Sequence, residues 1–192
     1  MVEQGALVVV SAPSGTGKST VLRRLMEFRK NLAFSVSATT RPPREGEKEG
    51  VDYFFLSREE FDRMVREDAF LEYAEYAGNL YGTPKAAVEA RLEQGCDVYL
   101  DIEVRGAMQV RSRRPDALMI FLMPPSMEEL ERRLVTRGKD LPEVIRQRLR
   151  EAEREIAARD RFDHVVVNDS VETAAREISG LIDAHREKLK KN

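Results

Sequence analysis

The sequence predicts an α/β protein in which helices flank a parallel sheet in three layers. Short, continuous apolar runs alternate with longer amphipathic segments along the chain, as is typical of strands buried on both faces. A glycine-rich loop, residues 11–20, follows directly on the first run, and two stretches, residues 35–83 and 126–161, break the alternation. We therefore expect a P-loop core that carries an inserted lobe with a mixed or antiparallel β-sheet and a helical lid.

The expected elements of the core follow in chain order. The apolar runs expected to form its strands are residues 6–10, 98–102, 118–123 and 165–167. One helix is expected after Lys18, because apolar residues recur there at helical spacing. A second should open at Pro84 behind Thr83 as its cap, and a third should begin with a capping box of Ser126 and Glu129.

The two inserted stretches have different patterns. In the first, polar and aromatic residues alternate around one helix that Ser57 and Glu60 would cap, which predicts a small antiparallel lobe. The second is rich in charge and predicts two long helices, with the i,i+4 ion pairs Glu128–Arg132, Glu129–Arg133 and Glu155–Arg159. The predicted division is residues 1–34, 84–125 and 162–192 for the core, 35–83 for the lobe and 126–161 for the lid.

Composition narrows the class of protein. A chain of 192 residues can form one core with inserted lobes, and a formal net charge of -2 provides no bulk attraction to nucleic acid or to an anionic membrane. We therefore expect neither as a partner. The single cysteine, Cys96, excludes an intramolecular disulfide and is expected to be buried. The amino-terminal segment is typical neither of a signal peptide nor of a membrane span, so a cytoplasmic location is expected.

The glycine-rich loop predicts a site for the phosphates of a nucleoside triphosphate. It reads A-P-S-G-T-G-K-S from Ala12 and matches the P-loop pattern G-x-x-x-x-G-K-[ST] except at that first position. Gly15 and Gly17 would turn backbone N–H groups toward the phosphates, Lys18 would neutralise charge, and Ser19 would offer a hydroxyl to Mg²⁺. The predicted ATP-binding residues here are Ala12, Pro13, Ser14, Gly15, Thr16, Gly17, Lys18, Ser19 and Thr20. The alternative is a tight turn between a strand and a helix.

An acidic residue at the end of a later strand has two interpretations. Asp101 follows Val98, Tyr99 and Leu100, which is the pattern of a Walker B aspartate that holds Mg²⁺ through water. The alternative is a cap of the following helix.

Four further segments bring the chain close to a known family. They are residues 37–47 (S-A-T-T-R-P-P-R-E-G-E), 50–53 (G-V-D-Y), 70–72 (F-L-E) and 78–83 (G-N-L-Y-G-T). In this order they resemble the nucleoside-monophosphate lobe of guanylate kinases, and the resemblance extends over nearly the whole chain. It includes Asp101-Ile102-Glu103, Pro124-Pro125-Ser126 with Arg133, Arg137-Gly138 and Val167-Asn168-Asp169. Ala12 in place of the first loop glycine is a variant that we associate with bacterial members.

The resemblance implies transfer of the γ-phosphoryl group of ATP to GMP, and to dGMP, with Mg²⁺, in purine nucleotide supply. Arg41 and Arg44 would grip the GMP phosphate together with Tyr53 and Tyr81. Glu72 would accept hydrogens from N1 and the 2-amino group of guanine, whereas adenine presents an acceptor at N1. Taken singly, the two arginines could instead be a solvated loop paired with acidic neighbours, and the tyrosines ordinary strand residues.

The remaining site residues come from the resemblance. Ser37 and Thr83 would complete the base pocket, and Glu103 would contact the guanine side where the family commonly has aspartate. The cations that act on the transferred group would be Lys18, Arg41 and Arg44 with the lid arginines Arg133, Arg137 and Arg148. Asn168 and Asp169 would lie beside the donor adenine, and the alternative for this pair is a helix cap.

Two rival functions stay open at this level. One is a related P-loop kinase that acts on another monophosphate. The other is a guanylate-kinase-like binding module without catalysis, which the complete Lys18 and Ser19 motif argues against. Either a monomer or a homodimer is compatible with the sequence.

Overall fold

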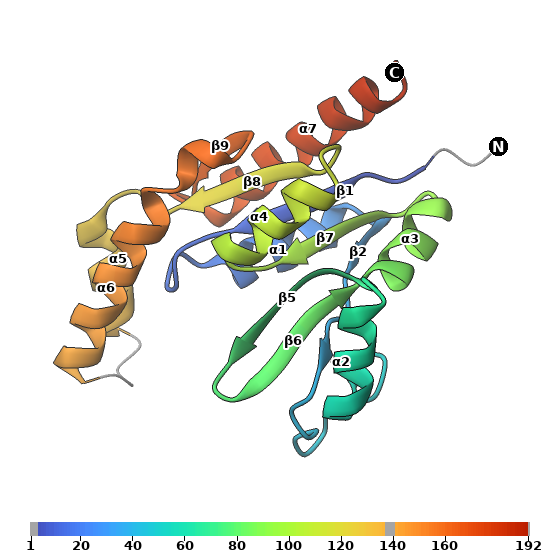
Figure 1. The fold of residues 1–192 in the computed structure, drawn as a ribbon. Coiled ribbons are helices and arrows are strands. Elements are labelled where there is room, and N and C mark those ends of the chain that lie inside the picture. Colours follow the sequence, from blue (N-terminus) through green and yellow to red (C-terminus); the bar gives the residue numbers. More distant parts are fainter. Residues whose placement is uncertain (1–3, 137–140, 192) are drawn as a thin grey trace.

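The fold of the core is the expected three-layer arrangement around a parallel sheet (Figure 1). The computed structural model describes residues 4–136 and 141–191. Five strands lie in the order β2-β7-β1-β8-β9, and all neighbours are parallel. Their bounds are β1 Leu7–Ser11, β2 Leu32–Phe34, β7 Asp97–Asp101, β8 Leu118–Met123 and β9 His164–Val167.

Helices cover both faces of this sheet because successive residues of β1 point to opposite sides. Val8 and Val10 pack in one cluster with α1 and α7, whereas Leu7 and Val9 pack in another with α3 and α4. These helices are α1 Lys18–Phe28, α3 Lys85–Glu93, α4 Val104–Arg113 and α7 Val171–Leu189. The continuous apolar run is therefore explained by burial on both faces.

The edges of the sheet differ from the expectation. The last apolar run forms β9, where only Val166 is buried, because this strand lies at an edge. The opposite edge strand, β2, has three residues and was not predicted as a strand. Cys96, expected to be buried, is only half-buried.

The inserted lobe contains a second, mixed sheet in the order β4-β3-β6-β5. Its elements are β3 Ala38–Thr39, β4 Phe54–Phe55, α2 Arg58–Arg66, β5 Phe70–Tyr76 and β6 Asn79–Pro84. The pair β3–β4 is parallel and the other two pairs are antiparallel. The capping box of Ser57 and Glu60 is present at α2. The predicted cap of α3 is wrong, since Pro84 is the N-cap and Thr83 lies inside β6.

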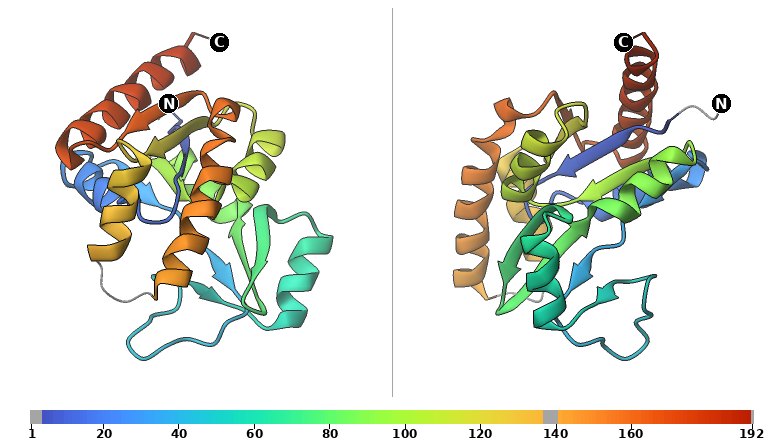
Figure 2. Two further views of the ribbon diagram at one scale, coloured as in Figure 1. Left: turned by 90° about the vertical axis from the view of Figure 1, so that its left-hand side faces the viewer. Right: turned by 45° about the vertical axis from the view of Figure 1, so that its right-hand side comes forward.

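Two helices, α5 (Met127–Thr136) and α6 (Pro142–Ile156), lie in the stretch predicted as a lid and are called the lid helices; they lie side by side in both views of Figure 2. They pack through Leu130, Leu134 and Ala152. The predicted pair of Glu129 with Arg133 is present, and the Ser126 hydroxyl accepts from the Glu129 N–H.

Two of the predicted lid ion pairs are wrong. Arg132 pairs with Glu129 and not with Glu128, because a partner three residues away is equally close on a helix. Arg159 pairs with Asp160 and not with Glu155, because α6 ends at Ile156 and Arg159 belongs to the following 3-10 turn.

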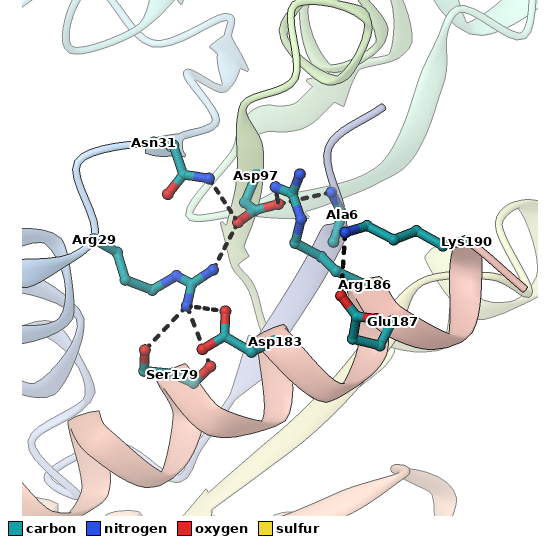
Figure 3. Close-up of polar contacts among 9 residues, drawn as sticks. All are labelled: Ala6, Arg29, Asn31, Asp97, Ser179, Asp183, Arg186, Glu187 and Lys190. Carbon is teal, nitrogen blue, oxygen red and sulfur yellow. Dashed lines mark hydrogen bonds and ion pairs between the residues drawn. The ribbon is translucent and has the colours of Figure 1, made fainter. Parts of the chain in front are cut away.

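A buried carboxylate fastens the core at the amino-terminal ends of the strands (Figure 3). Asp97 is fully buried and accepts hydrogen bonds from the backbone N–H of Ala6 at 2.9 Å and from the side chain of Asn31 at 3.3 Å. It also accepts from the guanidinium groups of Arg29 at 2.9 Å and Arg186 at 2.7 Å. These contacts join β1, the end of α1, β7 and α7. Within the described residues, no helix is long and apolar enough to cross a bilayer.

Candidate active site

The P-loop connects β1 to α1 at the carboxyl edge of the sheet, where ligands of open α/β sheets bind. Gly15 and Gly17 have φ angles of 94° and 93°, which favour glycine. A Cβ at Gly15 would lie 2.8 Å from Leu134 Cδ2, and one at Gly17 would lie 2.8 Å from Asn168 Nδ2. The loop thus needs glycine for both conformation and space, and it directs the positive end of α1 toward the site.

Lys18, at the start of α1, is in contact with Asp101, at the end of β7. Lys18 Nζ lies 2.6 Å from Asp101 Oδ1, and the two side chains are 17% and 29% exposed. The contact forms because β1 and β7 are paired in parallel and both end at this edge. Glu103, and not Asp101, is the N-cap of α4. The alternative interpretation of Asp101 as a helix cap is therefore wrong.

The loop lines a cavity of about 300 Å³. The lining residues are Ala12, Pro13, Ser14, Gly15, Gly17, Lys18, Ser19, Thr20, Glu103 and Glu155. Thr16 is buried and does not line it; its carbonyl accepts from other side chains of the site. The Ser19 side chain is exposed at the start of α1. Ser19 and Lys18 therefore share the cavity with six other residues of the predicted ATP set.

A lid carboxylate faces this cavity, and the sequence pattern did not indicate it. The pKa of Glu155 on α6 is raised to about 7, mainly by burial and then by the nearby Glu103 carboxylate, whereas Lys18 acts in the opposite sense. In the sequence, Glu155 is one of many charged residues in a polar helical segment, and only the packing of α6 brings it to the loop.

Arg133 of α5 joins the lid to the P-loop. Its guanidinium donates to the Thr16 carbonyl at 3.0 Å and to the Asn168 carbonyl at 3.2 Å, and it pairs with Glu129 at 2.7 Å. Arg148 is half-buried on α6, and Arg137 lies outside the described residues.

The segment after β9 also reaches the loop. The Asn168 amide donates to the Thr16 carbonyl at 2.7 Å, and Asn168 lines a second cavity of about 410 Å³ with Gly17 and Arg133. Ser170 is the N-cap of α7, with its hydroxyl accepting from the Thr173 N–H. The helix-cap alternative for Asn168 and Asp169 is therefore wrong. Asp169 is exposed and does not line this cavity.

Glu72 on β5 is a carboxylate with few partners. It is 7% exposed, and its Oε1 accepts from the Thr83 hydroxyl on the neighbouring strand at 2.6 Å. Burial raises its pKa and the charge of Glu103 adds to this, whereas the Thr83 hydrogen bond and the charge of Arg113 lower it. The structure thus places Glu72, Thr83 and Glu103 in one neighbourhood.

The aromatic and cationic residues of the lobe form one cluster. The Arg41 guanidinium donates to both carboxylate oxygens of Glu47, at 2.8 and 3.0 Å, and lies 5.4 Å from the centre of the Tyr53 ring. The rings of Tyr53 and Tyr81 are 6.1 Å apart.

Two other residues that were predicted to bind GMP lie near this cluster in the sequence. Arg44 is exposed, and its backbone N–H donates to Glu47 at 2.7 Å. Ser37 is half-buried, and its carbonyl accepts from the Phe54 N–H at 2.9 Å. Pairing with an acidic residue and clustering with tyrosines are therefore both present at Arg41.

The comparison with protein families decides which of the rival functions applies. The family model described as guanylate kinase matches residues 4–185. The chain belongs to the guanylate kinase family. It is therefore an enzyme that transfers a phosphoryl group from ATP to GMP, as its motifs predicted, and the two rival functions are not favoured.

Relatives agree along almost the full length. A guanylate kinase from Thermus thermophilus is 54% identical over 95% of this chain and 83% of its own, and one from Rubrobacter xylanophilus is 55% identical over 91% and 92%. The crystal structure of guanylate kinase from Anaplasma phagocytophilum, 38% identical, superposes with a TM-score of 0.73 over 96% of this chain and 87% of that one.

A more distant structure shares the fold alone. The SH3-kinase fragment of tight junction protein 3 is 10% identical, with a TM-score of 0.52 over 96% of this chain and 58% of that chain. Similarity at this level does not separate a kinase from a binding module.

Proposed function

We propose that this guanylate kinase binds ATP at the P-loop and GMP or dGMP on the second sheet, with Glu72 as the group that selects guanine. The observation that carries the proposal is that the buried Glu72 carboxylate has, among the described residues, a single side-chain donor, the Thr83 hydroxyl. Such a group lacks the hydrogen bonds that its charge needs. Guanine can supply two, through N1–H and the 2-amino group.

The acceptor phosphate is proposed to bind at the cluster of Arg41, Arg44, Tyr53 and Tyr81. Arginine suits this role because its planar group can donate two parallel hydrogen bonds to a phosphate. Support comes from the contact of Arg41 with Tyr53 and from the neighbouring Tyr81 ring. Ser37, Thr83 and Glu103 are proposed to complete the pocket of the base.

On the donor side, Lys18 and the backbone N–H groups of the loop are proposed to hold the triphosphate. A phosphate oxygen of GMP attacks the γ-phosphorus, the bond to the bridging oxygen breaks, and GDP and ADP result. The transition state is loose, so the protein contributes mainly alignment and positive charge. Lys18, Arg41 and Arg44, with Arg133, Arg137 and Arg148 from the lid, would supply that charge, while Asn168 and Asp169 would lie near adenine.

A magnesium ion fits the residues beside Lys18. Hydroxyl and carboxylate oxygens are the ligands that Mg²⁺ prefers, and Ser19 faces the cavity while Asp101 ends the neighbouring strand. When bound, the ion would neutralise charge on the β- and γ-phosphates. Asp101 would hold it through water.

The division of the chain gives the parts separate tasks. We propose residues 1–34, 84–125 and 162–192 as the core, 35–83 as the GMP lobe and 126–161 as the lid. Closure of lid and lobe would keep water from the transferred group. The reaction would serve purine nucleotide supply in the cytoplasm, by a monomer or a homodimer.

A coupled assay of ADP release with GMP, dGMP, AMP and UMP tests the proposal. The expected order is GMP and dGMP far above the others. Lys18→Ala should reduce turnover by roughly a thousandfold without loss of fold, because it removes charge at the transferred group. Glu72→Gln should reduce kcat/KM for GMP by roughly a hundredfold and leave the KM for ATP near its original value. Unchanged GMP kinetics in Glu72→Gln would refute the assignment of Glu72.

A further inference from the structure

Helix α4 covers the free edge of the strand that carries Glu72. Strand β5 lies at the edge of the second sheet, so on one side its backbone groups have no partner strand in the described part of the chain. Gln109 of α4 fills this role for Tyr73, since its Nε2 donates to the Tyr73 carbonyl at 2.9 Å and its Oε1 accepts from the Tyr73 N–H at 3.2 Å. Arg113 donates to the Leu71 carbonyl at 3.1 Å. The backbone is therefore held on both sides of Glu72.

One turn earlier on α4, a glycine leaves the space that the Glu72 carboxylate occupies. Gly106 is buried and lies three residues before Gln109, which places both on one side of the helix. A Cβ built on Gly106 would lie 2.9 Å from Glu72 Oε2 and 3.4 Å from its Cδ. Its backbone is not among the described glycines with positive φ, so space and not conformation explains the glycine. Glycine makes a helix less stable than alanine does. At this position it lowers the stability of α4 but leaves room for the Glu72 carboxylate.

We propose that α4 positions the carboxylate that recognises guanine, with Gly106 as a specificity determinant and Gln109 as a positioning residue that holds strand β5. The proposal rests on the proposed role of Glu72. Thr83 fixes Oε1, and Gly106 bounds the position of Oε2. Two hydrogen bonds to adjacent donors of one base require both oxygens in place, because a shift of a few tenths of an ångström lengthens at least one bond.

Comparison of GMP with IMP isolates this geometry. IMP keeps the N1–H of guanine but has hydrogen in place of the 2-amino group. The ratio of kcat/KM for GMP over IMP therefore reports how well the second hydrogen bond is made. A purely structural defect would lower both values together and leave the ratio unchanged.

Gly106→Ala is the first variant. The added methyl group is expected to displace the Glu72 carboxylate, raise the KM for GMP and lower the ratio of GMP to IMP by roughly tenfold. The KM for ATP should stay unchanged. The midpoint of thermal unfolding should not fall below that of the original protein. The matched control is Gly180→Ala on α7, where no heavy atom lies within 4 Å of the added Cβ, and its kinetics should match those of the original protein.

Gln109→Ala is the second variant, and it decides the proposal if Gly106→Ala does not fold. Loss of both hydrogen bonds to Tyr73 is expected to lower the ratio of GMP to IMP in the same direction by a smaller factor. Ser112→Ala, at an exposed position of the same helix, is its control.

The outcomes separate this inference from the proposed function. A large loss of GMP use in Glu72→Gln, with original ratios in Gly106→Ala and Gln109→Ala, would overturn the positioning role alone. Unchanged GMP kinetics in Glu72→Gln would overturn the role of Glu72 and this inference with it.

Discussion

Asp97 and Glu72 are both buried carboxylates, yet their surroundings differ in the number of donors. Asp97 is 0% exposed and accepts from four groups, two of which are guanidinium groups. Glu72 is 7% exposed and, among the described residues, accepts from one side chain, the hydroxyl of Thr83. Asp97 lies at the amino-terminal ends of the core strands, whereas Glu72 lies on the lobe beside α4.

This difference separates a charge that stabilises the fold from one that we propose binds a ligand. Burial of an ion is costly unless donors replace the water that it loses. At Asp97 the protein itself supplies these donors, so the charge fastens four segments together. At Glu72 the protein supplies fewer, and a ligand with two adjacent N–H groups can supply the rest. A buried carboxylate with unused acceptor capacity is therefore a marker for a recognition site.

The largest expected effect is on stability, at Asp97. Asp97→Ala leaves Arg29, Arg186 and the Ala6 N–H without their shared acceptor, and it should lower the free energy of unfolding by about 3–5 kcal/mol. Denaturant unfolding measures this. The activity of the protein that remains folded should be close to normal, because the network lies away from the P-loop.

A partner at the rim of the same network provides the control. Asp183 pairs with Arg29 at 2.7 Å but is 64% exposed, so Asp183→Asn should cost less than about 1 kcal/mol. Equal losses in the two variants would contradict the distinction between the buried and the exposed acceptor.

Glu47 is a case between these two extremes, because it is paired with Arg41 and lies in the cluster that is proposed to bind the GMP phosphate. It accepts two bonds from the Arg41 guanidinium and one from the Arg44 backbone N–H. Glu47→Gln should release Arg41 and raise the KM for GMP by roughly tenfold, with a smaller change in the KM for ATP. Steady-state kinetics with each substrate varied checks this, with Glu45→Gln at an exposed neighbour as the control. A lower KM for GMP would mean that Glu47 competes with the phosphate.

Local sequence patterns allowed much of the fold, and most of the P-loop, to be predicted. The P-loop depends on adjacent residues, so its spacing alone places Gly15, Gly17 and Lys18 between a strand and a helix. The runs at β1, β7 and β8 are long and buried, so their ends were correct to within about a residue. Strand β2 has only three residues, too few for a pattern to form.

Features that depend on distant packing could not be predicted. The local pattern at Thr83 resembles a helix cap, and only the family motifs marked it for the base pocket; its hydroxyl donates to Glu72 because β5 and β6 pair. Asn168 contacts a carbonyl 152 residues away in the chain, and Glu155 faces the P-loop only through the packing of α6. The family motifs marked Asn168 but not Glu155.

Substitution of Glu72 should change the free energy of unfolding less than substitution of Asp97 does. The change should also have the opposite sign. Burial raises its pKa above the value in the unfolded chain, so the folded protein holds this proton more tightly. Its contribution to stability is therefore fullest below the unfolded pKa and is lost as pH rises through the folded pKa. Glu72→Gln should flatten this dependence and add up to about 1 kcal/mol above that range. Denaturant unfolding across pH checks it, and a loss like that of Asp97→Ala would contradict it.

The smallest effect is expected at Glu155, a second carboxylate whose pKa is raised, here to about 7, mainly by burial and then by Glu103. Below pH 7 it is largely neutral; above pH 7 its charge faces the loop that is proposed to hold the triphosphate, near Lys18 and Glu151. The KM for ATP should therefore rise by about two- to fivefold between pH 6 and pH 8 in the original protein, because like charges repel across the cavity. Glu155→Gln should remove this rise, whereas Glu153→Gln, at an exposed position of the same helix, should retain it. An unchanged pH profile in Glu155→Gln would mean that the carboxylate points away from the phosphates when ATP is bound, and its raised pKa would then be a matter of lid packing alone.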